Sequence, residues 1–127
     1  MGKFLICKVP TGLTFHLKAA NGETIGTSEV YNSKEACLGG IESVKTNAPL
    51  APIEDRTAVN FKEEKCPKFQ VYAEHGDEKP RFRLLAKNGQ EILASQSYTS
   101  MESCIKGVHS VKANAPEAVV EEEPIKE

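Results

Sequence analysis

The chain has 127 residues, with 16 basic and 18 acidic side chains, seven prolines and nine glycines, a composition typical of one soluble domain. No stretch approaches the roughly 20 apolar residues of a membrane span, and the apolar run that follows Lys3 is too short for the core of a signal peptide. We therefore expect a cytoplasmic protein without a membrane partner.

The charges are unevenly distributed along the chain. Residues 117–127 carry five glutamates against one lysine, which leaves 15 basic and 13 acidic residues in 1–116. A body so close to neutral does not indicate a nucleic-acid-binding protein, which usually carries a strongly basic stripe. Residues 122–127 are predicted to form an acidic disordered tail.

The four cysteines do not form a metal-binding pattern. They stand about 30 residues apart, with no second cysteine and no histidine at ligand spacing. The sequence therefore predicts no metal site, and it leaves open the redox state of these thiols, which are Cys7, Cys37, Cys66 and Cys104.

The most informative feature is an internal repeat. Residues 15–49 align without a gap to residues 82–116, and 18 of the 35 aligned pairs are identical. Lys3 and Phe4 match Lys68 and Phe69 at an offset shorter by two, so the second copy has two extra residues near 76–78. The chain is thus a duplicated unit of about 50 residues.

Each copy begins with a pattern of three short strands. The first strand is expected at 4–7 and 69–72, the second at 15–19 and 82–86, and the third at 23–28 and 90–95. The Asn-Gly pairs at 21–22 and 88–89 predict type I′ hairpin turns, with positive φ at both residues. The facing of Ile25 and Ile92 stays open, because a two-residue turn would turn them away from Phe15 and a bulged loop would turn them toward it.

An amphipathic helix follows in each copy. Cys37, Ile41, Val44 and Ala48 lie on one helical stripe, which the second copy repeats. Asn32 with Glu35, and Thr99 with Glu102, read as capping boxes at the helix starts, and a proline at 49 or 116 closes each helix. A short last strand is expected at 51–54 and 118–121.

These elements predict an α+β fold in a single duplicated domain of residues 1–116. Repeat one covers about 1–54, the linker 55–66 and repeat two 67–121. A unit of three or four strands and one helix is marginal alone, and two units that share a sheet and a core are not. A pseudo-twofold arrangement is therefore expected.

The repeated motif resembles a known family. The pattern Phe-x-Leu-Lys-Ala-x-Asn-Gly-Glu, then Ser-x-x-Tyr-x-Ser, then Gly-Ile-x-Ser-Val-Lys-x-Asn-Ala, which runs from Phe15 to Ala48 and recurs at 82–115, is similar to the YegP-like family of small, mostly bacterial tandem-repeat proteins. The resemblance implies two β3-αβ motifs in one largely antiparallel sheet with two helices, and with the last strand of each motif exchanged into the other half. Single-repeat members look like dimers built in the same way, so this chain would be a monomer. The resemblance implies no catalytic residue.

Two groups of polar residues are candidate sites. Ser28 and Tyr31, with Ser95 and Tyr98 in the second copy, lie where a strand leads into a helix, whose N-terminus offers free N–H groups to an anion. The alternative is a capped corner in which the tyrosine only packs. The second group is His16, Lys18, Arg83 and Lys87, on the polar face of the second strand of each copy. These residues read first as an ordinary solvated sheet face, and the alternative is a basic surface for phosphate or nucleic acid.

The sequence favours a noncatalytic binding or protein-interaction module. The duplicated positions are mostly turn, cap and core residues, and no nucleophile, base and orienting group occur together among them, so an enzyme and a cofactor are not expected. One alternative is a sensor or enzyme for a small molecule or anion at the strand-to-helix corners, and a second is weak nucleic-acid binding on the basic face. The partner stays unknown, as another protein or a small anionic ligand.

Overall fold

The computed structural model describes residues 2–73 and 79–123. Repeat one contains β1 (Lys3–Val9), β2 (Gly12–Lys18), β3 (Thr24–Thr27), α1 (Lys34–Asn47) and β4 (Ile53–Asp55). Repeat two contains β5 (Lys68–Ala73), β6 (Pro80–Leu85), β7 (Glu91–Ala94), α2 (Met101–Asn114) and β8 (Val119–Glu122). The extra residues expected near 76–78 lie outside the described residues.

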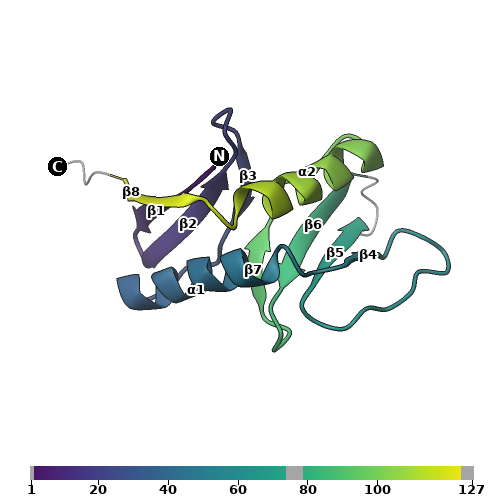
Figure 1. Cartoon of the computed structure of the whole chain (residues 1–127), viewed down its shortest axis with the longest axis horizontal. Helices are drawn as coiled ribbons and strands as arrows, with labels where there is room; N and C mark the ends of the chain where they lie inside the picture. The colour runs from purple at the N-terminus through teal and green to yellow at the C-terminus, as the bar shows by residue number, and fades with distance from the viewer. Residues whose placement is uncertain (1, 74–78, 124–127) are drawn as a thin grey trace.

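All eight strands form one sheet, in the order β4-β5-β6-β7-β3-β2-β1-β8 (Figure 1). Neighbouring strands are antiparallel except at the two edges, where β4 pairs parallel with β5 and β8 pairs parallel with β1. The last strand of each repeat therefore completes the sheet of the other repeat. This exchange confirms the topology that the family resemblance implies.

Both helices cover the same face of the sheet (Figure 1). Each helix contacts both halves, because α1 packs on β2 and β7 while α2 packs on β6 and β3. The core between the two layers is centred on two edge-to-face ring pairs, Phe4 with Phe15 and Phe69 with Phe82, all fully buried. No helix of the described residues lies on the other face of the sheet.

The hairpin turns differ from the expected type I′ geometry. Gly22 and Gly89 have positive φ, but no residue other than glycine among 2–73 and 79–123 does, so the neighbouring asparagines are in ordinary backbone regions. The Gly22 amide donates to Ala19 O at 2.9 Å, which gives a three-residue loop that ends in a glycine bulge. The sheet register shifts a second time within the strands, between Leu17 and Lys18 and between Leu84 and Leu85. Ile25 and Ile92 lie opposite these shifts and join the core.

The helix caps lie one residue later than predicted. Ser33 and Ser100 are the N-caps, and their hydroxyls accept from the amides of Ala36 and Ser103 at 3.1 Å. The capping boxes that start at Asn32 and Thr99 are therefore wrong, because serine caps a helix at least as well and stands closer to the first helical residue. The strands at the repeat ends also end one residue later than expected, at Asp55 and Glu122, and begin at Ile53 and Val119.

A tyrosine lies beneath each helix at a glycine. The Tyr31 ring stacks on Phe15 at 6.1 Å between centroids, and a Cβ added at Gly40 of α1 would lie 2.3 Å from the Tyr31 hydroxyl oxygen. Gly107 and Tyr98 repeat the arrangement in α2, at 2.4 Å. The neighbouring Gly39 has nothing within 4 Å of an added Cβ. Gly40 is therefore needed for the close packing of Tyr31 against α1, whereas Gly39 makes room for no neighbour.

We expect Gly39→Ala and Gly40→Ala to change stability in opposite directions. Alanine at position 39 should raise the free energy of unfolding by about 0.5–1 kcal/mol, because it favours the helix and meets no neighbour. Alanine at position 40 should lower it by about 1–3 kcal/mol, because Tyr31 must move. Urea denaturation of the two variants measures both effects, and an equal effect at the two positions would contradict the packing of Tyr31 against Gly40.

Candidate functional site

A row of side chains crosses the helix-free face of the sheet at one level. Strand register places one residue of each of the eight strands in this row, and the two halves of the row are related by the repeat. In spatial order they are Glu54, Gln70, Arg83, Ala94, Thr27, His16, Leu5 and Glu121. Each end of the row is therefore a glutamate, and Glu54 and Glu121 occupy the same position of the repeat.

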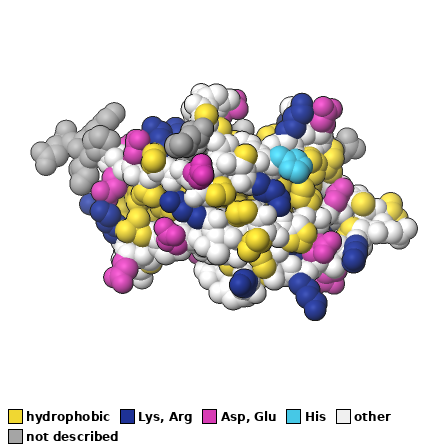
Figure 2. Space-filling model, in the orientation of Figure 1, with side chains coloured by type: hydrophobic (Ala, Val, Ile, Leu, Met, Phe, Trp, Pro, Cys, Tyr) yellow, Lys and Arg dark blue, Asp and Glu magenta, His cyan; other side chains and the backbone are white. Residues whose placement is uncertain are grey.

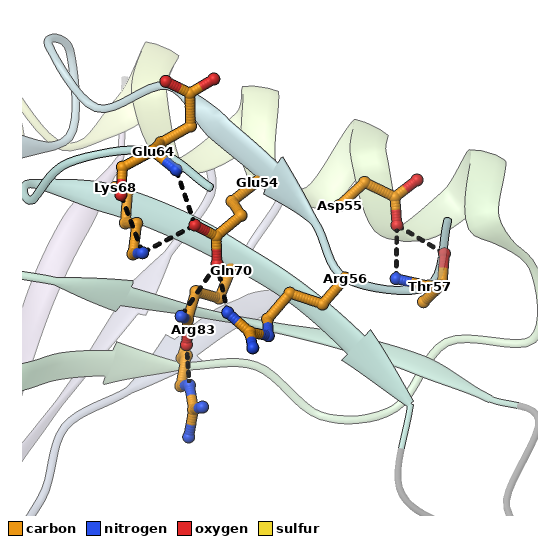
Figure 3. A network of polar contacts seen from close by, with 8 residues as sticks. All are labelled: Glu54, Asp55, Arg56, Thr57, Glu64, Lys68, Gln70 and Arg83. Carbon is orange, nitrogen blue, oxygen red and sulfur yellow. Dashed lines mark hydrogen bonds and ion pairs between the residues drawn. The ribbon is translucent and has the colours of Figure 1, made fainter. Parts of the chain in front are cut away.

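Glu54 is fully buried at one end of the row (Figure 3). Its Oε1 accepts from Arg56 at 2.8 Å and from Gln70 at 3.0 Å, and its Oε2 accepts from the Glu64 amide at 2.8 Å and from Lys68 at 2.6 Å. Four donors thus satisfy one carboxylate. The network ties β4 to β5 and, through Arg56 and the Glu64 backbone, to the segment 56–66 that joins these two strands.

These contacts hold Glu54 in its ionised form. Burial by itself would raise the pKa of the carboxyl, but the hydrogen bonds from Lys68, the Glu64 amide, Arg56 and Gln70 outweigh it and lower the pKa from 4.5 to about 2. Breaking a buried ion pair from one side leaves an uncompensated charge. The network therefore stabilises the attachment of the edge strand β4 to the sheet.

The same pair of residues stands exposed at the other end of the row. Lys3 and Glu121 occupy the repeat positions of Lys68 and Glu54, and Lys3 Nζ lies 3.3 Å from Glu121 Oε1. Their side chains are 41% and 52% exposed, against 7% and 0% for Lys68 and Glu54. One lysine–glutamate pair is therefore covered by the chain and its twin is open.

The structure separates the four residues of the expected basic face. His16 and Arg83 share the row, but Thr27 and Ala94 stand between them. His16 Nδ1 is hydrogen-bonded to Thr27 Oγ1 at 2.9 Å, and burial together with nearby Lys18 lowers the pKa of its imidazole. His16 therefore favours the neutral form more strongly than an exposed histidine.

Arg83 is held by its neighbours on the same face. Its Nε donates to Gln70 Oε1 at 2.7 Å, and its guanidinium lies 4.7 Å from the centre of the Tyr72 ring. Lys18 is at the end of β2 opposite Lys3, while Lys87 lies in the β6–β7 hairpin and lines a groove against α1. These four described residues therefore do not lie side by side on the face.

The serine hydroxyls at the strand-to-helix corners have a structural role. Ser28 Oγ accepts from the Phe15 amide at 2.9 Å and donates to Glu29 O at 2.7 Å, and Ser95 makes the same two bonds with Phe82 and Gln96. Tyr31 and Tyr98 pack under the helices, and Tyr98 also lines a groove beside α2. The packed corner accounts for these contacts.

Cys7, Cys37 and Cys104 are poor nucleophiles, because the pKa of each thiol is raised. Burial raises the pKa of Cys37, and it raises the pKa of Cys104 to about 11. Burial and a hydrogen bond to Glu123 raise the pKa of Cys7 to about 11 as well. Cys37 and Cys104 belong to the core, where a thiol behaves as a small apolar side chain.

Each helix is separated from the hairpin of the other repeat by one groove. The larger measures about 440 Å³ and lies between α1 and the β6–β7 hairpin, and the smaller measures about 230 Å³ and lies between α2 and the β2–β3 hairpin. Gly39 lines the first groove where Lys106 lines the second. The missing side chain at position 39 helps to keep the first groove open.

Asn47, which lines the larger groove, carries an unsatisfied polar atom. Asn47 is 6% exposed, and its Nδ2 donates to Ser43 O at 2.8 Å and to Ser43 Oγ at 3.0 Å. Its Oδ1 is buried and finds no partner among residues 2–73 and 79–123. Glu42, Ser43 and Thr46 of α1 line the groove with Asn47, and Lys87 and Asn88 face them from the hairpin. The groove is thus lined by one acidic, one basic and several neutral hydrogen-bonding side chains.

Sequence reasoning missed both the Glu54 network and the groove. A signal for the network existed, because Glu54 and Glu121 match at the repeat offset and Lys68 and Lys3 match at the offset of the first strand. The burial of one pair depends on how segment 56–66 folds back, which has no counterpart in the repeat pattern. The groove arises between repeats, so no local pattern predicts it.

Within the described ranges, no cluster of three or more His, Cys, Asp or Glu side chains is arranged to hold a metal ion. A search of the helices over the same residues finds none with the length and apolar character needed to cross a membrane. Basic and acidic side chains are interspersed on the helix-bearing face (Figure 2).

We expect Glu54→Gln to destabilise the fold far more than Glu121→Gln. The first substitution leaves Lys68 buried without its counter-charge and should cost about 3 kcal/mol. The second removes an exposed pair and should change stability by less than about 0.5 kcal/mol. Chemical denaturation compares the two, and similar costs would show that burial by segment 56–66 does not strengthen the pair.

The lowered pKa of Glu54 predicts a specific loss of stability in acid. The carboxyl binds a proton near pH 4.5 in the unfolded chain and near pH 2 in the folded chain, so its contribution is complete above pH 4.5 and disappears as the pH falls toward 2. Thermal melts between pH 2 and pH 6 should show a steeper decline for the wild type than for Glu54→Gln. Parallel declines would contradict the assignment.

Comparisons with known proteins agree with the repeat and the fold. A family model described as "Domain of unknown function (DUF1508)" matches residues 12–55 and 76–122, once in each repeat. A UPF0339 protein of Pseudomonas aeruginosa is 39% identical over 122 residues, which cover 95% of this chain and 96% of that protein. A UPF0339 protein of Methanosarcina acetivorans is 61% identical over 51 residues, 40% of this chain and 86% of that protein, so it is close to one repeat in size.

A solved structure shows the same architecture. The solution structure of YegP from Escherichia coli, described as a protein of unknown function, superposes with a TM-score of 0.78 at 35% sequence identity, and covers 99% of this chain and 96% of that one. Sequence match, repeat spacing and strand order therefore agree. The chain belongs to the YegP-like UPF0339 family, whose function is not characterised.

Proposed function

We propose that this protein is a noncatalytic binding module whose ligand occupies the groove between α1 and the β6–β7 hairpin. The unsatisfied Oδ1 of Asn47 carries the proposal. A buried acceptor without a partner costs about 1–3 kcal/mol, and a ligand that donates an N–H group would recover part of that cost. At about 440 Å³ the groove is within the usual size range of small-molecule sites.

The chemistry of the groove favours recognition over catalysis. Glu42 and Lys87 supply one charge of each sign, and Ser43, Thr46 and Asn88 supply neutral hydrogen-bonding groups. This set suits a polar ligand with an N–H donor, such as a small amide or amine or the side chain of a partner protein. Cys37 and Cys104 are occupied by core packing, and Ser28 and Ser95 by backbone hydrogen bonds.

The groove also gives a reason for two repeats in one chain. Its walls come from the helix of repeat one and the hairpin of repeat two, so each repeat supplies half of it. The twin groove carries Lys106 in place of Gly39, and Lys106 Nζ lies 3.5 Å from Glu102 Oε1. Divergence of the two copies has thus left one groove larger than the other, which an identical pair of repeats would not do.

Native mass spectrometry of the protein gently purified from its own host tests the proposal. The wild type should carry a small bound molecule above the 13.9 kDa mass of the chain. Gly39→Tyr should lose it, because position 39 opens into the groove and a tyrosine there fills the space. Lys106→Tyr is the matched control at the same repeat position and should keep the ligand.

Two outcomes would contradict the proposed site. Wild-type protein with no added mass under several purification conditions would leave the groove without a ligand. A bound molecule retained by Gly39→Tyr would place the ligand elsewhere. The stability of Gly39→Tyr is checked by its thermal melt, so that loss of binding is not confused with loss of fold.

A further inference from the structure

We propose that the helix-free face over β1 and β8 binds an extended segment of a partner protein, held by Lys3 and Glu121 in the way that Lys68 and Glu54 hold the chain's own segment 56–66. This surface lies on the opposite side of the sheet from the groove beside α1. The proposal therefore goes beyond the proposed function and does not depend on it.

The covered half of the face provides the template. Glu54 Oε2 accepts from the backbone amide of Glu64 at 2.8 Å, and Lys68 Nζ donates to the backbone carbonyl of the same residue at 2.9 Å (Figure 3). Lys68 Nζ also donates to Glu54 Oε2 at 2.6 Å. One lysine–glutamate pair thus satisfies both polar backbone groups of a single residue in the segment that joins β4 to β5.

This mode of recognition does not depend on the side chain that is held. A carboxylate accepts any backbone N–H and an ammonium donates to any backbone carbonyl, and hydrogen bonds with a charged partner are stronger than neutral ones. Main-chain bonds of this kind give affinity in peptide recognition, and neighbouring pockets or charges give specificity. The same chemistry therefore transfers to any equivalent lysine–glutamate pair that lies open.

Lys3 and Glu121 are that equivalent pair. They lie on β1 and β8 as Lys68 and Glu54 lie on β5 and β4, and both edges are parallel with matching registers. Lys3 Nζ and Glu121 Oε1 are 3.3 Å apart, and both side chains are about half exposed. The pair is already assembled, so a partner segment need not organise it.

The surroundings of the open pair define the chemistry of the partner. Leu5 takes the place of Gln70 in the row, and Val119 beside it is 51% exposed. Glu123 takes the place of Arg56, so the edge near Glu121 is acidic where its twin is basic. The segment that fits is extended, with an apolar side chain over Leu5 and Val119 and basic side chains toward Glu121 and Glu123.

A synthetic peptide tests the surface on the full chain. The probe is a capped nonapeptide with the sequence of residues 57–65 in which E63K and E64L are introduced, so that it keeps the length of the template and gains the basic and apolar groups. In a ¹⁵N-correlation titration we expect shifts at the amides of Lys3, Leu5 and Glu121. Amides lining the groove, such as that of Lys87, should stay unchanged.

Two neighbouring glutamates provide the test and its matched control. Glu121 lies on the helix-free side, whereas Glu122 Oε1 lies 2.9 Å from Lys34 Nζ, next to α1. Glu121→Ala should weaken peptide binding about fivefold, the effect of losing one hydrogen bond to a charged group at an exposed site. Glu122→Ala removes the same charge and should leave the affinity within about twofold.

Several results would overturn the proposal. Absence of shifts at Lys3, Leu5 and Glu121 at about 10 mM peptide would mean that the pair does not hold a chain segment. Equal weakening by the two alanine variants would mean general attraction to an acidic edge. Shifts confined to the groove would assign the peptide to the other face. Each variant is first compared with the wild type by its spectrum and thermal melt.

Discussion

Neither repeat can complete its own sheet, and the rest of the structure depends on this constraint. The strand that ends each repeat lies at the far edge of the other half, where it pairs parallel with that half's first strand. Helix α1 reaches across to β7 and α2 to β3, so the core is shared in the same way. Lys112 of α2 adds a tie, because its Nζ donates to Ala51 O at 2.6 Å where repeat one leads into β4. A separated repeat would lose an edge strand and half of its helical cover at once.

Beside the pseudo-twofold axis, the two copies carry side chains of very different size at one repeat position. Gly26 of β3 and Leu93 of β7 occupy the same repeat position, and a Cβ at Gly26 would lie 2.6 Å from Leu93 Cγ. Two leucines would collide there and two glycines would leave a void, so one large and one small residue fill the centre. A dimer of identical single repeats cannot make this choice. Duplication within one chain thus permits an asymmetric core and, at positions 39 and 106, two unequal grooves.

Much of the fold could be predicted from the sequence, because repeated apolar periodicity determines which face of each element is buried. The Phe15 and Phe82 strands, the Cys37 and Cys104 helix stripes and the exchanged last strands, implied by family resemblance, all agree with the structure. The turn type and the caps were wrong, because each depends on a choice between adjacent polar residues of similar propensity, such as Asn32 and Ser33. The site was harder to predict. The serines and tyrosines at the corners recur because the fold needs them, whereas Asn47, Lys87 and Glu54 matter through partners that lie far away in the sequence.

The pairing of β1 with β8 sets the order in which the molecule can form during synthesis. Strand β1 leaves the ribosome long before its outer partner, because that edge is filled only when Val119–Glu122 has been made. Until then β1 presents an open edge, and the contacts that complete it are the most distant in the chain, which favours slow folding. The other parallel edge is different, since β4 and β5 are separated only by the segment 56–66 and can pair as soon as repeat two begins. The half that contains β1 is therefore completed only after β8 has been made, although most of its residues precede those of the other half.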